Sequence, residues 1–400
     1  MTDQSFSTLN RLTIAFFGRR NAGKSRLMNA VTAQDVSIVS DVKGTTTDPV
    51  KKTMELLPLG PVTVIDTPGI DDEGDLGALR VQKTLRVLQT CDIAVLVVDS
   101  TLGFSAADTQ LESLLSEKRI PYVIAFTKSD LLDAVPDSHD NCVYVSAASA
   151  LNVGLLKERI SALRPSGSER FFVRDLIHPG DFVVLVIPID SSAPKGRLIL
   201  PQQLAIRDIL EAGAVPLCCG VDNLLPTISA LAKPPALVIT DSQAFAAVSA
   251  ALPAGQPLTS FSILMARMKG FLNQAVRGAF ALDSLQDGDT VLVSEGCTHH
   301  RQCEDIGTVK LPAWCRSHTK RSLLFEFTSG GGFPDDVSRF ALIIHCGACM
   351  LNDNEVRRRM ELCAAFGTPV TNYGTAIAHM NGILSRSLEP LRFAQTQEVL

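Results

Sequence analysis

A glycine-bounded loop near the start of the chain carries the residues best suited to phosphate chemistry. The stretch from Gly18 to Ser25 has the spacing G-x-x-x-x-G-K-[ST] and ends in Lys24 and Ser25. Backbone N–H groups at a helix start attract phosphate oxygens, because they lack partners within the helix and the helix dipole favours negative charge there. Lys24 would add a positive charge for the β- and γ-phosphates, and the Ser25 hydroxyl suits Mg2+. The loop therefore predicts a nucleotide phosphate site.

A second stretch could hold the metal ion and the terminal phosphate of that nucleotide. The apolar run 62–65 ends in the sequence DTPG, which spans Asp66 to Gly69. Asp66 would supply a carboxylate to the Mg2+ shell, and the Gly69 N–H could approach the γ-phosphate. The polar run 40–49 contains three threonines and a proline, which disfavour a helix and indicate a mobile switch loop.

A third set of residues would select the base. The sequence Thr127-Lys128-Ser129-Asp130 follows the apolar run 122–126. The Asp130 carboxylate can accept both N1–H and N2–H of guanine, a pair of donors that adenine does not offer. After one more apolar strand, the backbone of Ser146 and Ala147 can meet the guanine oxygen. These residues predict GTP or GDP as the ligand.

Two sulfur-bearing turns lie far apart in the last third of the chain. Cys297 and His299 follow the predicted strand 290–294, and His345, Cys346 and Cys349 follow the apolar run ending at 345. Loops at the carboxyl ends of neighbouring parallel strands converge in one crevice, so the three thiols can meet. Three soft donors suit an iron–sulfur cluster or zinc, and the spacing alone leaves both metals open.

The elements that must position these residues are apolar runs alternating with helical patterns, which is typical of parallel sheets covered on both faces. We predict an α/β chain of three domains, which span residues 1–165, 170–263 and 264–400. A linker at Pro165–Ser168 follows the first domain, and the second is a small parallel α/β domain. The third is an α/β domain that begins with a long helix from Leu264 to Leu282. The middle helices are alanine-rich and carry few charges, so one face would pack on a second copy in a homodimer.

Composition narrows the classes of protein that fit. The 400 residues carry a net charge of −5, which argues against nucleic acid as the main partner. The start of the chain lacks a signal-peptide pattern and no apolar run approaches about 20 residues, so we expect a cytoplasmic protein without a membrane span. In that reducing compartment the ten cysteines are read as metal or redox groups before disulfides.

The first domain resembles the translation-factor-type small GTPases in the order and spacing of its G1, G3, G4 and G5 motifs. It departs from them at Thr127, where asparagine is usual, and at Ile70, where Ras-like enzymes have a glutamine. Asn21 and the run 44–48 resemble the potassium-activated GTPases of the tRNA-modification and Era type. That resemblance implies K+ at Asn21, Mg2+ at Ser25 and Thr46, and catalytic roles for Lys24, Thr46, Asp66 and Gly69. The nucleotide-binding residues it implies are Gly18, Asn21, Ala22, Gly23, Lys24, Ser25, Arg26, Thr45, Thr46, Asp66, Gly69, Thr127, Lys128, Asp130, Ser146 and Ala147.

The whole chain resembles the HydF family of FeFe-hydrogenase maturation GTPases. The resemblance rests on C-x-H followed by H-C-x-x-C behind a potassium-type GTPase and a middle α/β domain, and on a late stretch with Tyr373, Gly374 and Asn381. It implies a 4Fe–4S cluster on Cys297, Cys346 and Cys349 with an open fourth iron, and His299 and His345 as further candidate ligands. It also implies a scaffold that matures a diiron subcluster precursor with the radical-SAM maturases HydE and HydG and passes it to apo FeFe-hydrogenase.

Two other functions fit parts of the chain. An RNA- or ribosome-associated potassium GTPase with a structural zinc fits the first domain, although a basic tail and a G-x-x-G KH loop are missing. An electron-transfer enzyme would fit a cluster with four thiolates better than one with three. We read Arg19, Arg20 and the run Arg357–Arg359 as solvated or partner-facing, and the remaining cysteines together with His318 and His379 as structural.

Overall fold

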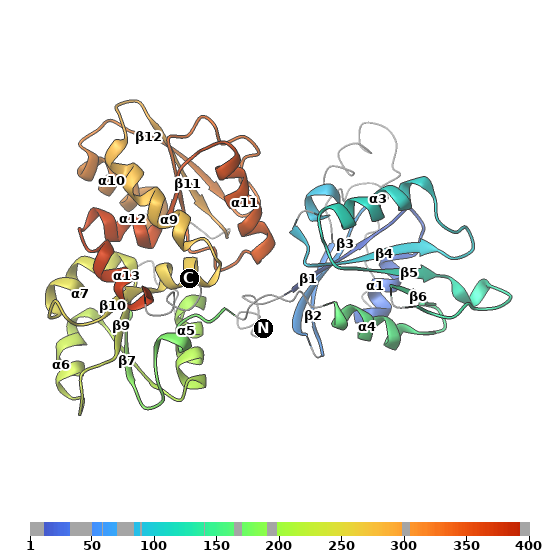
Figure 1. Ribbon diagram of the computed structural model, residues 1–400, viewed down its shortest axis with the longest axis horizontal. Coiled ribbons are helices and arrows are strands. Elements are labelled where there is room, and N and C mark those ends of the chain that lie inside the picture. The colour runs from blue at the N-terminus through green and yellow to red at the C-terminus, as the bar shows by residue number, and fades with distance from the viewer. Residues whose placement is uncertain are drawn as a thin grey trace. The chain divides into compact units, whose positions relative to one another are not determined.

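The computed structural model describes residues 12–32, 50–57, 59–69, 84–88, 90–139, 141–163, 170–189, 198–297 and 305–392. The chain forms two compact units, residues 10–168 and residues 169–400 (Figure 1). The predicted switch loop with Thr45 and Thr46, Ile70, the linker 165–168 and His299 lie outside the described residues. No helix within the described ranges is long and apolar enough to cross a membrane.

The N-terminal unit is a six-stranded sheet in the order β2-β3-β1-β4-β5-β6, parallel except for the edge strand β2, which the sequence analysis does not predict. Strand β1 is buried on both faces: Ile14 and Phe16 pack against α1 and α4, and Ala15 and Phe17 pack against α3. The elements are β1 Leu12–Phe17, α1 Lys24–Thr32, β2 Val50–Leu56, β3 Gly60–Asp66, β4 Ile93–Asp99, α3 Ala106–Glu117, β5 Tyr122–Thr127, β6 Cys142–Tyr144 and α4 Val153–Ala162.

The second unit contains two parallel four-stranded sheets. The first has the order β10-β9-β7-β8 and follows the predicted alternation of strands and helices. Its elements are β7 Phe182–Val186, α5 Leu200–Glu211, β8 Val215–Cys219, α6 Leu224–Ser229, β9 Leu237–Thr240, α7 Phe245–Ala251, β10 Leu258–Ser260 and α8 Phe261–Met268.

The other sheet has the order β12-β11-β13-β14, and all its pairs are parallel. Strand β14 is too short to stand out in the sequence. The elements are α9 Leu272–Ala279, β11 Thr290–Glu295, α10 Leu311–Thr319, β12 Leu324–Ser329, β13 Leu342–His345, α11 Asp353–Ala365, β14 Val370–Asn372, α12 Tyr373–Met380 and α13 Leu384–Arg392. The α/β class with parallel sheets is thus confirmed.

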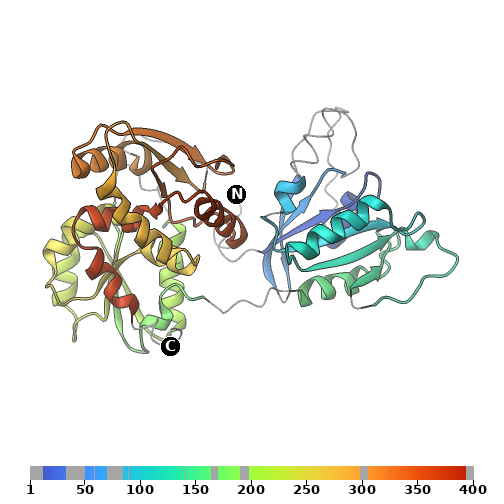
Figure 2. The same cartoon turned by 45° about the horizontal axis from the view of Figure 1, so that its top comes forward.

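The predicted helix from Leu264 to Leu282 is wrong in one respect, because it is two helices. Gly270 adopts a φ of +81° between α8 and α9, a conformation that ends α8 and turns the chain. Helix α8 contacts α5 and β10 on one side and α9, α12 and β14 on the other. One continuous core therefore joins both sheets, and the boundary predicted between residues 263 and 264 falls inside α8. Figure 2 shows the ribbons of both sheets within the second unit.

Candidate functional site

The loop predicted to bind phosphate connects β1 to α1 through two glycines with positive φ, a conformation that other residues rarely adopt. Gly18 has a φ of +146°, and a Cβ atom there would lie 2.2 Å from the Val97 carbonyl oxygen. Gly23 has a φ of +92° just before α1 begins at Lys24. The loop therefore passes tightly over β4 and points the first N–H groups of α1 outward, as an anion site needs.

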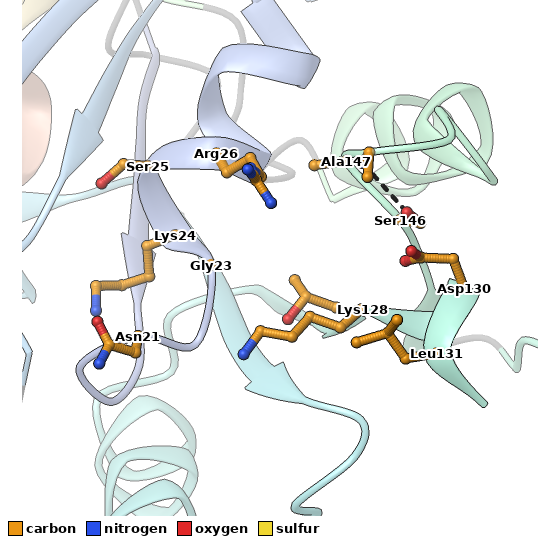
Figure 3. A pocket seen from close by; sticks show the side chains of 12 residues that line it. Asn21, Gly23, Lys24, Ser25, Arg26, Lys128, Asp130, Leu131, Ser146 and Ala147 are labelled. Carbon is orange, nitrogen blue, oxygen red and sulfur yellow. Dashed lines mark hydrogen bonds between the residues drawn. The ribbon is translucent and has the colours of Figure 1, made fainter.

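A pocket of about 500 Å3 opens in front of this loop. Figure 3 shows Asn21, Lys24 and Ser25 on one side of it and Asp130, Ser146 and Ala147 on the other. The residues predicted to bind phosphate and those predicted to select the base thus line a single cavity. The lining residues are Asn21, Gly23, Lys24, Ser25, Arg26, Thr127, Lys128, Asp130, Leu131, Ser146, Ala147 and Ala148.

Lys24 is folded onto the loop that carries it. Its Nζ donates to the carbonyl oxygens of Gly18 at 3.0 Å and Arg19 at 2.7 Å, and the side chain is buried. The loop carbonyls thus hold the ammonium beside the first N–H groups of α1. A phosphate that binds at those groups meets a cation already in place.

Ser25 and Asp66, which are predicted to bind Mg2+, form a group of oxygen ligands that suits a divalent cation. The Ser25 hydroxyl donates to Asp66 Oδ2, while the buried Asp66 Oδ1 has no hydrogen-bond partner among the described residues. Burial raises the pKa of Asp66, although the Ser25 hydrogen bond and the charges of Lys24 and Lys52 act in the opposite direction. A buried carboxylate with an unpartnered oxygen next to a hydroxyl is a donor set that a hard cation would complete.

Thr127, the departure from the usual asparagine, ties the base-binding strand to the phosphate loop. Its hydroxyl donates to the Ala22 carbonyl at 2.6 Å and lies 3.2 Å from the Val98 carbonyl.

The neighbouring Lys128 has a φ of +59° and pairs with Asp99 at 2.5 Å. Burial alone raises the pKa of Asp99, but hydrogen bonds from Lys128 and Thr101 outweigh it and hold the pKa below its ordinary value.

The base-selecting end of the pocket is built from turns. Asp130 lies exposed in a short 3-10 turn after β5, free to meet a ligand from solvent. The buried Ser146 uses its hydroxyl to accept from the N–H groups of Ala148 and Ser149, which fixes the loop that would face the guanine oxygen.

Arg19 is not the solvated residue that the sequence analysis expects. Its Nε lies 3.0 Å from Asp108 Oδ2, and its Nη2 donates to the Gly103 carbonyl at 2.9 Å. Asp108 is fully buried at the start of α3, where it also closes a capping box with Ser105. Arg19 thus fastens the phosphate loop to α3.

The second candidate site lies where β11 and β13 end side by side. Strand β11 leads into Cys297, and β13 leads into Cys346 and Cys349. Burial raises the pKa of Cys297 to about 11 and that of Cys349 to about 12, and in both the charge of Cys346 contributes. Cys346 Sγ also accepts from the N–H of Gly296, the residue before Cys297, so the two turns lie side by side.

The surroundings of these thiols suit thiolates that carry a metal. Cys346 Sγ accepts from the N–H groups of Gly296 at 3.1 Å and Ala348 at 3.3 Å. The buried Lys269 donates to the Leu351 carbonyl at 2.8 Å, and its charge lowers the pKa of Cys349 against the larger effect of burial. Amide donors to sulfur and a buried cation are the groups that stabilise anionic iron–sulfur centres.

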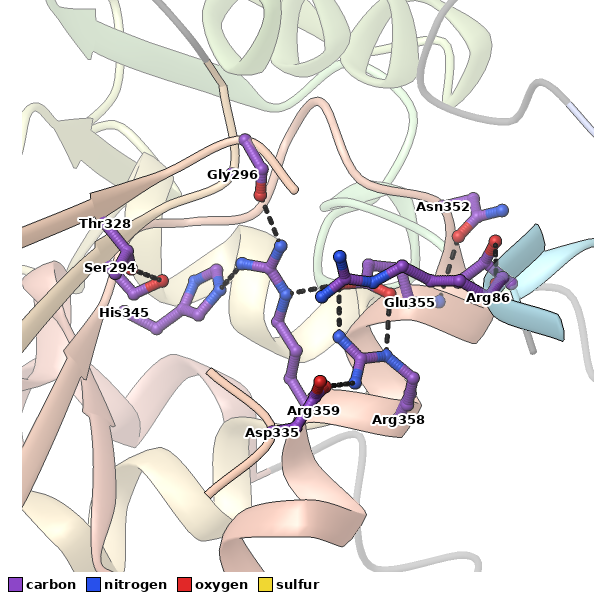
Figure 4. Close-up of polar contacts among 12 residues, drawn as sticks. Arg86, Ser294, Gly296, Thr328, Asp335, His345, Asn352, Glu355, Arg358 and Arg359 are labelled. Atoms are coloured by element: carbon purple, nitrogen blue, oxygen red, sulfur yellow. Dashed lines mark hydrogen bonds and ion pairs between the residues drawn. The ribbon is translucent and has the colours of Figure 1, made fainter. Parts of the chain in front are cut away.

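A buried arginine supports the same turn (Figure 4). Arg359 on α11 contacts His345 Nε2 at 3.0 Å, donates to Glu355 Oε1 at 2.7 Å and to the Gly330 carbonyl at 2.6 Å, and is fully buried. The expectation that Arg357–Arg359 is a solvated run is therefore wrong for Arg359. Its position on the apolar stripe of Val356, Met360 and Cys363 is the sequence signal that would have revealed this.

His345 lies within this network instead of facing the thiols. Its Nδ1 lies 2.9 Å from the Cys346 carbonyl, and its Nε2 contacts Arg359. Burial, together with the charge of Arg359, lowers the pKa of His345 to about 4, so the ring is neutral. To ligate a metal through either nitrogen, the ring would have to give up the partner on that nitrogen.

Three family models match successive parts of the chain. The 50S ribosome-binding GTPase family matches residues 13–128, the hydrogen maturase F dimerization domain matches residues 172–270, and the hydrogen maturase F tetramerization domain matches residues 273–390.

Individual relatives match part of the chain. GTPase Der of Kosmotoga olearia is 36% identical over 31% of this chain and 29% of its own length. The tRNA modification GTPase MnmE of Herminiimonas arsenicoxydans is 32% identical over 41% of this chain and 37% of its own length. The chain thus spans about a third of the length of these curated relatives. A crystal structure of Aquifex aeolicus Era bound to GDP and aluminium fluoride is 20% identical, with a TM-score of 0.34, over 52% of this chain and 92% of that one.

Both family models that cover the second unit are hydrogen maturase F domains, and they follow a GTPase domain in the order that the sequence resemblance predicts. The chain therefore belongs to the HydF family, the hydrogenase maturation GTPases.

Proposed function

We propose that this protein is a GTP-hydrolysing scaffold that carries a 4Fe–4S cluster and delivers the diiron subcluster precursor to apo FeFe-hydrogenase. The observation that carries the proposal is the convergence of Cys297, Cys346 and Cys349 beside amide donors and a buried cation, within the stretch that the hydrogen maturase F models match.

In the nucleotide site, Lys24 and the first N–H groups of α1 hold the β- and γ-phosphates, and Asp130 reads the base. Ser25, Asp66 and Thr46 are the Mg2+ ligands, and the ion would neutralise charge that develops on the phosphates during hydrolysis. Asn21, at the rim of the same pocket, binds K+ next to them. The Gly69 N–H faces the γ-phosphate.

In the cluster site, Cys297, Cys346 and Cys349 would hold the cluster, which would offer an open iron position to an exchangeable ligand. An open iron suits a scaffold, because cargo can bind there and leave again. His299 is one candidate for that position. Both nitrogens of His345 already have partners, Arg359 and the Cys346 carbonyl, so we assign His345 to positioning the turn.

Three thiolates suit either an iron–sulfur cluster or zinc. The match of this part of the chain to the hydrogen maturase F domain models supports the choice of iron–sulfur.

The hydrogen maturase F domain models are named for dimerization and tetramerization, and we propose a homodimer as the minimal unit. Strand β8 at the edge of its sheet exposes Val215 and Cys218, and the edge strand β12 exposes Leu324. Unpaired, apolar sheet edges favour pairing with another chain. HydE and HydG would load the cargo in the cytoplasm, and GTP hydrolysis would time the release of partners.

A transfer assay tests this function. The chain is purified anaerobically from cells that also make HydE and HydG, and is incubated with apo FeFe-hydrogenase. The wild-type chain and Cys363→Ala, which removes a buried thiol on α11, should both activate hydrogen evolution. Cys346→Ala should lose its iron and the activation while it keeps GTP hydrolysis. Activation by Cys346→Ala equal to that by Cys363→Ala would contradict the proposal.

A further inference from the structure

A surface cluster in the second unit brings together two histidines and a carboxylate from separate elements. Asp283 lies in the 3-10 turn Phe280–Ser284 after α9, His318 in the last turn of α10 and His379 in the last turn of α12. These three elements pack on one another. Both histidines are predicted to be structural, because they lie outside the cysteine motif.

The ligand atoms of the cluster already lie almost where a metal would hold them. His318 Nε2 is 2.8 Å from Asp283 Oδ1, and His379 Nε2 is 2.9 Å from Asp283 Oδ2. The three side chains place one ligand atom each within 4.8 Å of the others. Around a tetrahedral zinc with bonds of about 2.0 Å, neighbouring ligand atoms are separated by about 3.3 Å. Changes of at most about 1.5 Å in the separations of these atoms would therefore bring them to the spacing around a zinc ion.

The surroundings restrain the rings and favour positive charge. The His379 ring packs edge-on against Phe280 at 5.0 Å and against His318 at 5.6 Å, which limits how either imidazole can turn. Both histidines lie at helix C-termini, where the unpaired carbonyls favour a cation. Asp283 remains half exposed while His379 is largely buried, so the cluster is open to solvent on the carboxylate side.

We propose that Asp283, His318 and His379 form a site for a divalent transition metal of the zinc type, separate from the cysteine centre. Two imidazoles and one carboxylate are ligands that zinc and its first-row neighbours accept with a coordination position left open, whereas Mg2+ prefers oxygen ligands throughout. With the metal bound, each imidazole would carry its proton on Nδ1 and offer Nε2 to the ion.

Cobalt(II) is the probe, because its visible spectrum separates nitrogen and oxygen ligands from thiolates. The full-length chain is titrated anaerobically after its cysteine centre has been filled with iron and sulfide, and bound cobalt is counted after dialysis. The wild type should bind about one cobalt more per chain than His379→Gln, and the affinity should fall about ten- to a hundredfold in His318→Gln and Asp283→Asn. The extra cobalt should show no sulfur-to-metal charge-transfer band.

The chain offers a matched control. His178 forms a surface pair with Asp181, its Nδ1 lying 3.6 Å from the Asp181 oxygen, but no second histidine is part of that pair. His178→Gln should bind cobalt like the wild type. Equal cobalt binding by the wild type and His379→Gln would show that the three side chains only form hydrogen bonds with one another, and would contradict the proposed metal site. Sulfur ligands on the extra cobalt would contradict it as well. If His379→Gln does not fold, Asp283→Asn, which preserves the shape of the carboxylate, carries the same test.

Discussion

The nucleotide pocket and the cysteine centre are built in different ways. In the pocket, one short loop supplies Lys24 and Ser25, and backbone geometry at Gly18 and Gly23 decides whether the phosphate site forms. In the cysteine centre, thiols from two distant turns depend on Lys269 and Arg359, which come from other helices and are buried beneath them. A site formed by one loop can therefore be recognised from its sequence motif. A site assembled from distant segments cannot be recognised in full in this way, because the buried charges that support it lie elsewhere in the sequence. Four variants test this difference between the two sites.

The largest effect is expected where a buried charge supports the cysteine centre. Arg359→Met leaves Glu355 with one ion-pair partner fewer in an interior position, which should lower the free energy of unfolding of the second unit by about 3–5 kcal/mol. Urea denaturation followed by circular dichroism measures this, with Arg357→Met, an exposed neighbour on the same helix, as the control. Equal stability of the two variants would show that the Arg359 network contributes nothing.

Lys24→Ala tests whether the two sites are independent. Removing the ammonium from the phosphate loop should slow GTP hydrolysis about 100- to 1000-fold, because its charge acts on the phosphates in a partly dry pocket. The iron content of Lys24→Ala after anaerobic reconstitution should stay at the wild-type value. The surface variant Lys118→Ala should keep both the wild-type rate of GTP hydrolysis and the wild-type iron content. Loss of iron together with hydrolysis would contradict separate sites.

The dependence of GTP hydrolysis on potassium should require the side chain of Asn21. GTP hydrolysis by the wild type should be on the order of tenfold faster in KCl than in NaCl at equal ionic strength, because a bound cation stabilises charge on the phosphates. Asn21→Ala should be equally slow in both salts. Equal wild-type rates in the two salts would remove the K+ assignment and leave the rest of the pocket unchanged.

The smallest effect is expected at Thr127. Thr127→Val keeps the shape of the side chain but leaves the Ala22 carbonyl without its hydroxyl donor, which should weaken GDP binding by about 1 kcal/mol, or about fivefold. Thr127→Ser keeps the hydroxyl and should bind GDP like the wild type in a calorimetric titration. If the valine variant binds equally well, the link between β5 and the phosphate loop is not used in binding.

The sequence allowed correct prediction of the features that local patterns encode. The parallel sheets follow from apolar runs such as 93–99, and the pocket follows from consecutive motif residues such as Lys24 and Ser25. Residues whose role depends on tertiary packing were missed. Arg19 pairs with Asp108 on α3, 89 positions later, and a single arginine in a polar loop gives no sign of such a partner. The break at Gly270 was also missed, because the apolar pattern continues through it.

The most direct test of the central claim, that the three cysteines meet around iron, is an analysis of metal and sulfide in the anaerobically purified chain. We predict a brown protein with about four irons and about four sulfides per chain, and loss of both in Cys297→Ala, whose thiol comes from the turn other than that of Cys346 and Cys349. A colourless protein that holds zinc through these cysteines, or one whose iron content does not change in Cys297→Ala, would contradict the claim.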